Sequence, residues 1–364
     1  LRKRLRSFVP RPKAATLETL DALPEQAPET DAPLTVFEAE VVALREVSAV
    51  LRAVDAGAVI VNERTRRPTP PACRALGQVL AAPDVGAPKD PVRAYAWPLL
   101  LQAGGLARVR GQRLVLTPAG RAALGTAPEV LLKRLWSSWA ESEDFDEFRR
   151  IEVVKGQGGR AAAFFTSLPE RRACVVAALA ECPVGRWVEL RALLRHMRIL
   201  GRDFVVHADP WLLFVGDAEH GAMGYDGGPQ VMTQAYTRCL LFEYLATLGI
   251  VDLAFVDPTQ APDVYWADLG DVDWLDLFSR YDGLSFVRLT PFGAHALGLR
   301  RTYRAPAVVS RTALRVLPNL DVVATHRLTP ADRLFLGIFA SPSSELVWRL
   351  DRNRLIQAAE EGRP

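Results

Sequence analysis

The side chains that could do chemistry form two groups, one acidic and one basic. The acidic group lies in residues 203–226, where carboxylates and imidazoles could ligate a metal ion or act as acid and base. Its members are Asp203, His207, Asp209, Asp217, Glu219, His220 and Asp226. Their spacing matches no metal-site pattern, and several stand beside Pro or Gly, where Asp is typical of turns. We therefore expect surface loops there, without a metal ion, a cofactor or a catalytic residue.

The basic group consists mainly of arginines, whose planar guanidinium binds phosphate through two hydrogen bonds. Some stand in the loop "NERTRRPTP", where Thr69 can cap a helix whose first N–H groups would add phosphate donors. Others flank a predicted hairpin, follow a Gly-rich segment, or recur on one helix face. The predicted nucleic-acid-binding residues are Arg64, Arg66, Arg67, Thr69, Arg108, Arg110, Arg113, Lys155, Arg160, Arg191, Arg195 and Arg198. The alternatives are a solvated basic surface and, for the "KGQGGR" segment, a flexible joint.

Charge is distributed unevenly along the chain, although the net charge is only +3. Residues 56–126 contain ten Arg and Lys against three Asp and Glu, whereas residues 203–283 contain two against fourteen. Blocks of opposite sign favour electrostatic pairing, within the chain or with a partner. The four scattered cysteines form no Cys-x-x-Cys pair, which favours free thiols in a reducing cytoplasm. There is no apolar run of about 18 residues, so no membrane span is predicted.

Apolar spacing and capping residues predict the elements that position the first basic residues. A helix is predicted from Thr35, as its N-cap, to Gly57, followed by a short strand "AVIVN". Two more helices follow, the second interrupted by Pro98, and then a hairpin that turns at "GQ". Helix, strand, helix, helix, hairpin is the order of a winged helix, whose third helix usually reads DNA. Here the third helix, "RAYAWPLLLQA", is mostly apolar, which argues against direct base readout.

A short phrase closes this unit and recurs. "RLVLTPAGRAALG" and "FVRLTPFGAHALGL" both read as a strand, a Thr cap at Thr117 or Thr290, a Pro at the first helical position and a closing helix. A second winged-helix-like unit with acidic insertions is therefore predicted before the second copy. "HRLTPADRLFLG" repeats the cap at Thr329, in a tail that reads strand, turn, strand, helix, short strand, helix. Trp136 and Trp139, three residues apart in a bridging helix, are predicted to be core residues.

The predicted fold class is α+β, mainly helical, with two winged-helix-like units followed by a small α/β domain. The predicted divisions are a basic arm and linker over 1–34, a winged-helix-like domain over 35–127, a helical bridge with a Gly-rich joint over 128–167, a second winged-helix-like domain over 168–304 and an α/β domain over 305–364 that is expected to be truncated.

Several segments together resemble bacterial helicase-associated proteins whose C-terminal part is similar to the N-terminal domain of XPB-type helicases. The segments are "TRRPTPPACRAL", "RAYAWPLLLQAGGL", "FDEFRRIEVVKGQ", "ECPVGRWVELRALLRHMR", "DPWLLFVGD", "LLFEYLATLGIVDLAF" and "LRVLPNLDVV". The resemblance implies association with DNA-translocating enzymes, and it defines no catalytic residues. The chain has no Walker A motif, so it cannot be an autonomous helicase.

These observations predict a non-enzymatic accessory module of the cytoplasm, in genome maintenance or phage defence. Its partner would be DNA, duplex or single-stranded, or a helicase or ATPase protein. The alternative is a protein–protein scaffold, or an acidic DNA mimic, because the block over 203–283 would repel DNA and could bind a basic partner.

Overall fold

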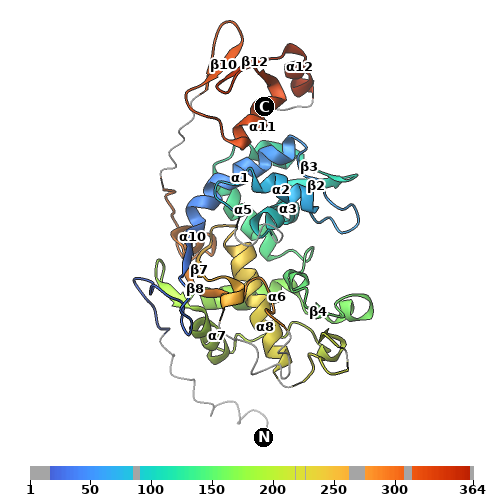
Figure 1. Ribbon diagram of the computed structural model, residues 1–364, viewed down its shortest axis with the longest axis vertical. Coiled ribbons are helices and arrows are strands. Elements are labelled where there is room, and N and C mark those ends of the chain that lie inside the picture. Colours follow the sequence, from blue (N-terminus) through green and yellow to red (C-terminus); the bar gives the residue numbers. More distant parts are fainter. Residues whose placement is uncertain are drawn as a thin grey trace. The chain divides into compact units, whose positions relative to one another are not determined.

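The computed structural model describes residues 17–84, 91–217, 219–225, 227–261, 275–306 and 314–360 (Figure 1). In these ranges the fold is mixed α and β, with helices and small antiparallel sheets. The described residues form two compact units, each assembled from distant segments. Unit 1 draws on Leu1–Phe37, Asp146–Leu241 and Asp252–Leu297, and unit 2 on Glu38–Phe145, Phe242–Val251 and Gly298–Pro364. The predicted domain boundaries stay a prediction, and the basic arm over 1–13 lies outside the described residues.

Unit 2 contains a helical part and a C-terminal sheet with two helices. The helical part consists of α1 (Ala39–Asp55), α2 (Pro70–Gly77), α3 (Arg93–Ala103), β2 (Ala107–Arg110), β3 (Arg113–Leu116), α4 (Pro118–Ala123) and α5 (Pro128–Ala140). The C-terminal part consists of β9 (Leu314–Val316), β10 (Asp321–Ala324), α11 (Pro330–Phe339), β11 (Ala340–Pro342), β12 (Val347–Leu350) and α12 (Arg352–Glu360). None of the described helices, here or in unit 1, combines the length and the apolar character needed to cross a membrane.

The core of the helical part follows from amphipathic spacing. On α1, residues Ala43, Val47 and Val50 are buried at intervals of four and three, which places them on one face. Trp139 of α5 is fully buried, and its ring stacks on Tyr244 with centroids 5.1 Å apart. Trp136 is also buried. The prediction that these tryptophans belong to the core is confirmed.

The predicted start of the first helix is wrong. Residues Thr35–Phe37 form strand β1, which pairs antiparallel with β7 (Val251–Phe255), and α1 begins only at Ala39. Thr35 lies opposite Phe255 in that pairing, and the N-cap position of α1 is Glu38. The apolar residues of this segment continue the helical pattern, so their spacing alone could not separate the strand from the helix.

The C-terminal part forms a four-stranded sheet in the order β11-β12-β10-β9. Thr329 caps α11 by accepting a hydrogen bond from the N–H of Asp332 at 3.1 Å, as its sequence predicts. The tail contains one strand more than predicted, because β11 follows α11 directly and pairs with β12. The side chain of Asp351 accepts from the N–H groups of Asn353 and Arg354, and so caps α12.

Unit 1 contains a four-stranded antiparallel sheet in the order β1-β7-β8-β5, with helices and a smaller pair of strands. Its further elements are β4 (Val154–Lys155), α6 (Leu168–Leu179), β5 (Trp187–Glu189), α7 (Leu190–Ile199), β6 (Phe214–Val215), α8 (Gly228–Cys239), β8 (Leu284–Leu289) and α10 (Pro291–Ala296), besides the short 3-10 helices Glu147–Arg150, Gly159–Phe164, Pro210–Leu212 and Pro258–Gln260. A π-helical turn over Leu240–Leu245 follows α8 directly.

The same order of elements occurs twice along the chain. The first repeat runs α1, an extended segment at 59–61, α2, α3, β2, β3 and α4. The second repeat runs α6, β5, α7, α8, β7, β8 and α10. In both, the extended residues between the first two helices hydrogen-bond to the last strand: Leu114 N donates to Val59 O at 3.0 Å, and β5 pairs with β8.

Both repeats close with the predicted cap. Thr117 accepts from Gly120 N at 3.0 Å, and Thr290 accepts from Gly293 N at 2.7 Å. A Pro follows each Thr at the first helical position. The two copies of Leu-Thr-Pro are therefore the same local structure.

Candidate nucleic-acid interface

The hairpin β2–β3 carries arginines on one outward face. Arg108 lies opposite Val115 and Arg110 opposite Arg113, whereas the buried Ala107, Leu114 and Leu116 occupy the alternate positions. Residues directly opposite each other in an antiparallel pair point to the same face, and so do residues two apart on a strand. The three arginines therefore share a face, and all three are exposed. We call Arg108, Arg110 and Arg113 the hairpin arginines.

A third extended segment joins the predicted arginine loop to this hairpin. Val61 N donates to the carbonyl of Gln112 at 2.9 Å, at the hairpin turn, and Ile60 forms a bridge with Arg113. The predicted strand "AVIVN" is thus present as a short extended segment. Val61 and Gln112, which are distant in sequence, therefore meet at the hairpin turn, and the loop over 62–67 follows Val61 at once.

The arginine loop is tightly built. Asn62 Oδ1 accepts from the N–H groups of Arg64 and Thr65 at 3.1 and 2.9 Å, and Asn62 N donates to Arg67 O at 2.9 Å. Arg64 is exposed and Arg67 is half-buried. Arg66 is held elsewhere: its guanidinium lies 2.7 Å from Asp144. Of the loop arginines, Arg64 is therefore the best placed to meet a phosphate.

The predicted donors at the start of α2 are largely absent. Thr69 does cap α2, accepting from Ala72 N at 3.4 Å. However, Pro70 and Pro71 have no N–H groups, and the cap already uses the next one. The expectation that this helix end adds phosphate donors is wrong, and the anion-binding capacity of the region rests on its side chains.

The third helix of the first repeat is inaccessible, as its composition indicates. Of residues 93–101 in α3, only Tyr95 is not buried. Arg93 donates to the buried carboxylate of Glu46 at 2.5 Å, and Trp97 Nε1 donates to the same carboxylate at 3.1 Å. Burial raises the pKa of Glu46, and the charge of Arg93 opposes that rise. The one charged residue of this helix is thus committed to the core.

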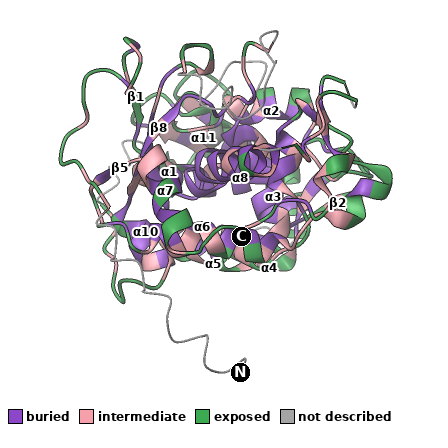
Figure 2. Ribbon diagram, turned by 90° about the horizontal axis from the view of Figure 1, so that it is seen from below, coloured by how far each residue is buried: buried purple, intermediate pink, exposed green. Residues whose placement is uncertain are grey.

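The third helix of the second repeat is buried in the same way (Figure 2). Tyr236 of α8 donates its hydroxyl to the buried Glu147 at 3.1 Å, and Arg172 of α6 donates to that carboxylate at 2.6 Å. Arg171 forms a second ion pair with Asp146, at 2.8 Å. Burial raises the pKa of Glu147, and the nearby Arg172 opposes it. No local pattern predicts these buried clusters, because their partners come from distant segments. The available signal in the sequence is a charged residue on an otherwise apolar helix face, which indicates a buried ion pair.

The remaining predicted basic residues lie in unit 1 and fall into two places. On α7, Arg195 and Arg198 are exposed, whereas Arg191 forms an ion pair with Glu29 that lowers the pKa of that carboxyl. Lys155 and Arg160 are exposed on the Gly-rich segment. Arg195 and Arg198 therefore remain exposed on α7, and Lys155 and Arg160 remain exposed on the Gly-rich segment. Arg191, by contrast, is paired with a carboxylate of the same chain.

The described residues of the acidic group lie at the surface or in turns except His207, for which the expectation of a surface loop is wrong because its ring is enclosed by the chain. Asp217 Oδ1 accepts from Glu219 N at 2.7 Å, which is a turn motif. His207 is buried, with Asp209 N donating to its Nδ1 and its Nε2 lying 2.8 Å from the carbonyl of Ala161. Among the residues that the structure describes, no three His, Cys, Asp or Glu side chains gather as metal ligands do. Asp226 and residues 262–274 lie outside that description.

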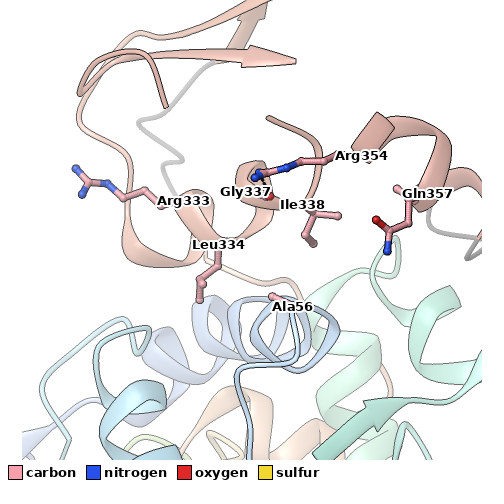
Figure 3. A pocket seen from close by; sticks show the side chains of 8 residues that line it. Ala56, Arg333, Leu334, Gly337, Ile338, Arg354 and Gln357 are labelled. Carbon is pink, nitrogen blue, oxygen red and sulfur yellow. Dashed lines mark hydrogen bonds between the residues drawn. The ribbon is translucent and has the colours of Figure 1, made fainter. Parts of the chain in front are cut away.

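A cavity of about 420 Å³ lies in unit 2 between α11, α12 and the end of α1 (Figure 3). Leu334 points toward Ala56, while Arg333 points away (Figure 3). Arg354 donates from Nη1 to the carbonyls of Gly337 and Ala340, at 2.8 and 2.9 Å. That arginine joins α12 to the end of α11.

The exposed hairpin arginines with Arg64 are thus the strongest candidate site in unit 2. Comparisons with known proteins add no assignment, since no family model and no curated protein matches this chain.

Proposed function

We propose that this chain is a non-enzymatic nucleic-acid-binding module that contacts the phosphates of duplex DNA through the hairpin arginines and Arg64. The order of elements in each repeat, and the pairing of its extended segments, are those expected of a winged helix. The hairpin β2–β3 is then the wing. A wing that carries arginines on its solvent face is suited to backbone contacts.

The observation that carries the proposal is the pairing of Arg110 with Arg113. Two like charges directly opposite on a hairpin destabilise it, by about 0.2–1 kcal/mol for pairs of this kind. A third arginine, Arg108, shares the face. Such an arrangement is compensated when an anion lies over it, because each guanidinium then gains a charge-assisted hydrogen bond. Phosphate groups along a nucleic-acid backbone supply anions at regular spacing.

The buried third helices indicate what kind of binding this is. Base edges in the major groove are usually read by the third helix of a winged helix, and here both α3 and α8 face the protein interior. Affinity would therefore come from phosphate contacts and would depend little on base sequence. An accessory protein of a DNA-translocating helicase or ATPase needs this property, which agrees with the family resemblance.

The test is duplex binding across a salt series. We expect wild-type protein to bind a 20-base-pair duplex at about 50 mM salt and to lose affinity steeply toward about 200 mM. Arg110→Glu should weaken binding by about tenfold and reduce the salt slope by about one or more. Two duplexes of unrelated sequence should bind alike. Fluorescence anisotropy measures the affinity, its dependence on salt and its dependence on base sequence.

The matched control is Arg134→Glu, which makes the same charge change at an exposed position of α5, outside the hairpin. It should leave affinity nearly unchanged. If Arg134→Glu weakened binding as much as Arg110→Glu, net charge would explain the effect and the assigned face would be wrong. If wild-type protein did not bind at about 50 mM salt, the chain would instead be a protein–protein scaffold.

A further inference from the structure

Two aromatic side chains of unit 1 lie together on the surface. Trp211 is 57% exposed and Tyr225 is 52% exposed. Their ring centroids are 5.0 Å apart, with an interplanar angle of 75°. Large aromatic side chains usually contribute to the core, and an exposed pair of this kind marks a binding site more often than an isolated exposed residue does.

The backbone beneath the pair holds the tryptophan ring in place. A Cβ atom on Gly224 would lie 2.2 Å from Cδ2 of Trp211, so the ring rests directly on the glycine backbone. Met223 N donates to Leu213 O at 2.8 Å, which joins the segments carrying the two rings. One side of the indole is thus supported by protein, and its exposed area remains available to a ligand without rearrangement.

A basic, glycine-rich segment runs beside the aromatic pair. Lys155 lies opposite Phe214 in the antiparallel pairing of β4 with β6, so the residues after Lys155 run back toward Trp211. A Cβ on Gly156 would lie 2.2 Å from the carbonyl oxygen of Leu212, the neighbour of Trp211. The close approach requires glycine. Lys155 and Arg160, which bracket this segment, are both exposed.

The pairing continues beyond the glycines. Ala208 N donates to Phe164 O at 2.7 Å, and Thr166 N donates to Val206 O at 3.1 Å. The two segments are therefore paired at both ends, and the 3-10 helices Gly159–Phe164 and Pro210–Leu212 lie between these pairings. Because both ends are hydrogen-bonded, Lys155 and Arg160 are held on the same small substructure as Trp211.

From this arrangement we infer that Trp211 and Tyr225 stack an unpaired nucleobase of single-stranded nucleic acid, with Lys155 and Arg160 contacting its phosphates. Exposed aromatic rings flanked by cations are the recurring means of binding single strands without sequence preference, since every base has a stacking face. In a duplex the bases are already stacked and paired, so this surface selects single strands. The site lies in the other compact unit from the hairpin arginines and does not rest on them.

A short hairpin that follows Trp211 supports this selectivity. Residues 213–215 and 221–223 pair through hydrogen bonds from Met223 N to Leu213 O and from Val215 N to Gly221 O, and the exposed Asp217 and Glu219 lie at the tip. Their carboxylates repel phosphate, so a broad duplex lying across the hairpin would meet them with its second strand. A single strand that crosses only the base of the hairpin avoids them.

The test uses the full chain with a labelled oligo(dT) 20-mer and with an oligomer of equal length that contains abasic residues. Trp211→Ala should lower oligo(dT) affinity by about tenfold, since one base-stacking contact is of that size. Trp211→Phe should retain most of the affinity. Wild-type protein should bind the abasic oligomer about as weakly as the alanine variant binds oligo(dT), and the two losses should not add. Circular dichroism confirms that the variants are folded.

The matched control is Val205→Ala, which removes a side chain that is 50% exposed on the same insertion but outside the aromatic pair. It should bind oligo(dT) as wild type does. The inference is overturned if Trp211→Ala binds oligo(dT) like wild type, or if wild type binds both oligomers equally. Binding of a proline-rich basic peptide, without any oligo(dT) binding, would also overturn it and would assign the pair to a protein partner.

Duplex binding separates this inference from the proposed function. Loss of single-strand binding in Trp211→Ala with normal duplex binding supports two separate sites. Normal single-strand binding in a chain that binds no duplex would leave the aromatic site standing and refute the role of the hairpin arginines.

Discussion

The last two strands of the two repeats follow the same elements, yet they meet different surroundings. In the first repeat, β2 and β3 form a hairpin whose arginines are exposed. In the second, β7 and β8 lie inside a four-stranded sheet, with β1 on one side and β5 on the other. The arginine of β8, Arg288, is neutralised by Asp252 at 2.8 Å and lies over Trp187, 4.5 Å from the ring centroid. The same order of elements thus produces an exposed surface suited to binding anions in the first repeat and an interior sheet in the second.

The third helices of the two repeats, by contrast, are buried in the same way. Each contributes an aromatic donor, Trp97 or Tyr236, to a buried carboxylate that also accepts from an arginine. A buried carboxylate is tolerated only when its hydrogen-bonding capacity is satisfied, because removing it from water is costly. The comparison indicates that the helical cores are built for stability in both repeats, and that the difference in function lies in the terminal strands.

The largest expected effect comes from breaking the shared feature. Arg172→Met leaves the carboxylate of Glu147 buried without its arginine, and the free energy of unfolding should fall by about 3–5 kcal/mol. Arg93→Met should do the same to Glu46. Urea denaturation measures both losses. Adding Glu147→Gln to Arg172→Met should recover part of the loss; a loss below about 1 kcal/mol for either single variant would contradict the comparison.

A smaller effect should separate the two closing caps. Thr290 is fully buried and Thr117 is half-buried, although both accept from the N–H three residues on. We expect Thr290→Ala to cost about 1–2 kcal/mol and Thr117→Ala about 0.5–1 kcal/mol. Replacement by Ser, which keeps the acceptor, is the control for each. Equal costs in thermal denaturation would show that the buried environment of the second cap adds nothing.

A pH series should show whether the two buried carboxylates, Glu46 and Glu147, affect stability in the same way. Burial raises the pKa of both Glu46 and Glu147 above the ordinary value of 4.5. Between that value and the raised pKa, the folded state binds more protons than the unfolded state, so stability falls as pH rises through this window. Glu46→Gln should flatten this dependence. A variant whose denaturation midpoint changes with pH as steeply as wild type would refute the assignment.

The smallest effect is expected at the interior sheet. Asp252→Asn removes the charge that neutralises Arg288 without exposing the strand. Duplex affinity should stay within about twofold of wild type, since a cation contributes to backbone binding only where phosphate can reach it. Anisotropy under the conditions used for Arg110→Glu measures this. A marked gain in affinity would show that β8 is a second accessible wing and would erase the distinction between the repeats.

Much of the local structure could be read from the residues. Thr117 and Thr290 each precede a Pro, and a cap needs only these neighbours. The apolar composition of "RAYAWPLLLQA" indicated that α3 would not read bases, and the helix is buried. The start of α1 was misplaced because β1 is defined by pairing with β7, more than two hundred residues away. No local pattern carries that information.

The candidate sites divide in the same way. Alternation along the hairpin predicts that Arg108 and Arg110 share a face, and a glycine at the turn predicts the hairpin itself. The engagement of Arg66 by Asp144 and the meeting of Trp211 with Tyr225 could not be foreseen. Both contacts depend on how the chain between the two residues folds back.

By itself, then, the sequence determined the caps, the hairpin, the helical periodicity and the excess of arginine near that hairpin, because each depends on residues within one or two turns of each other. Only the tertiary structure decided which arginines remain exposed, which charged residues are buried against the third helices, and which of two equivalent pairs of strands faces solvent. Burial and charge pairing are properties of segments far apart in the chain, and they are settled only when those segments pack.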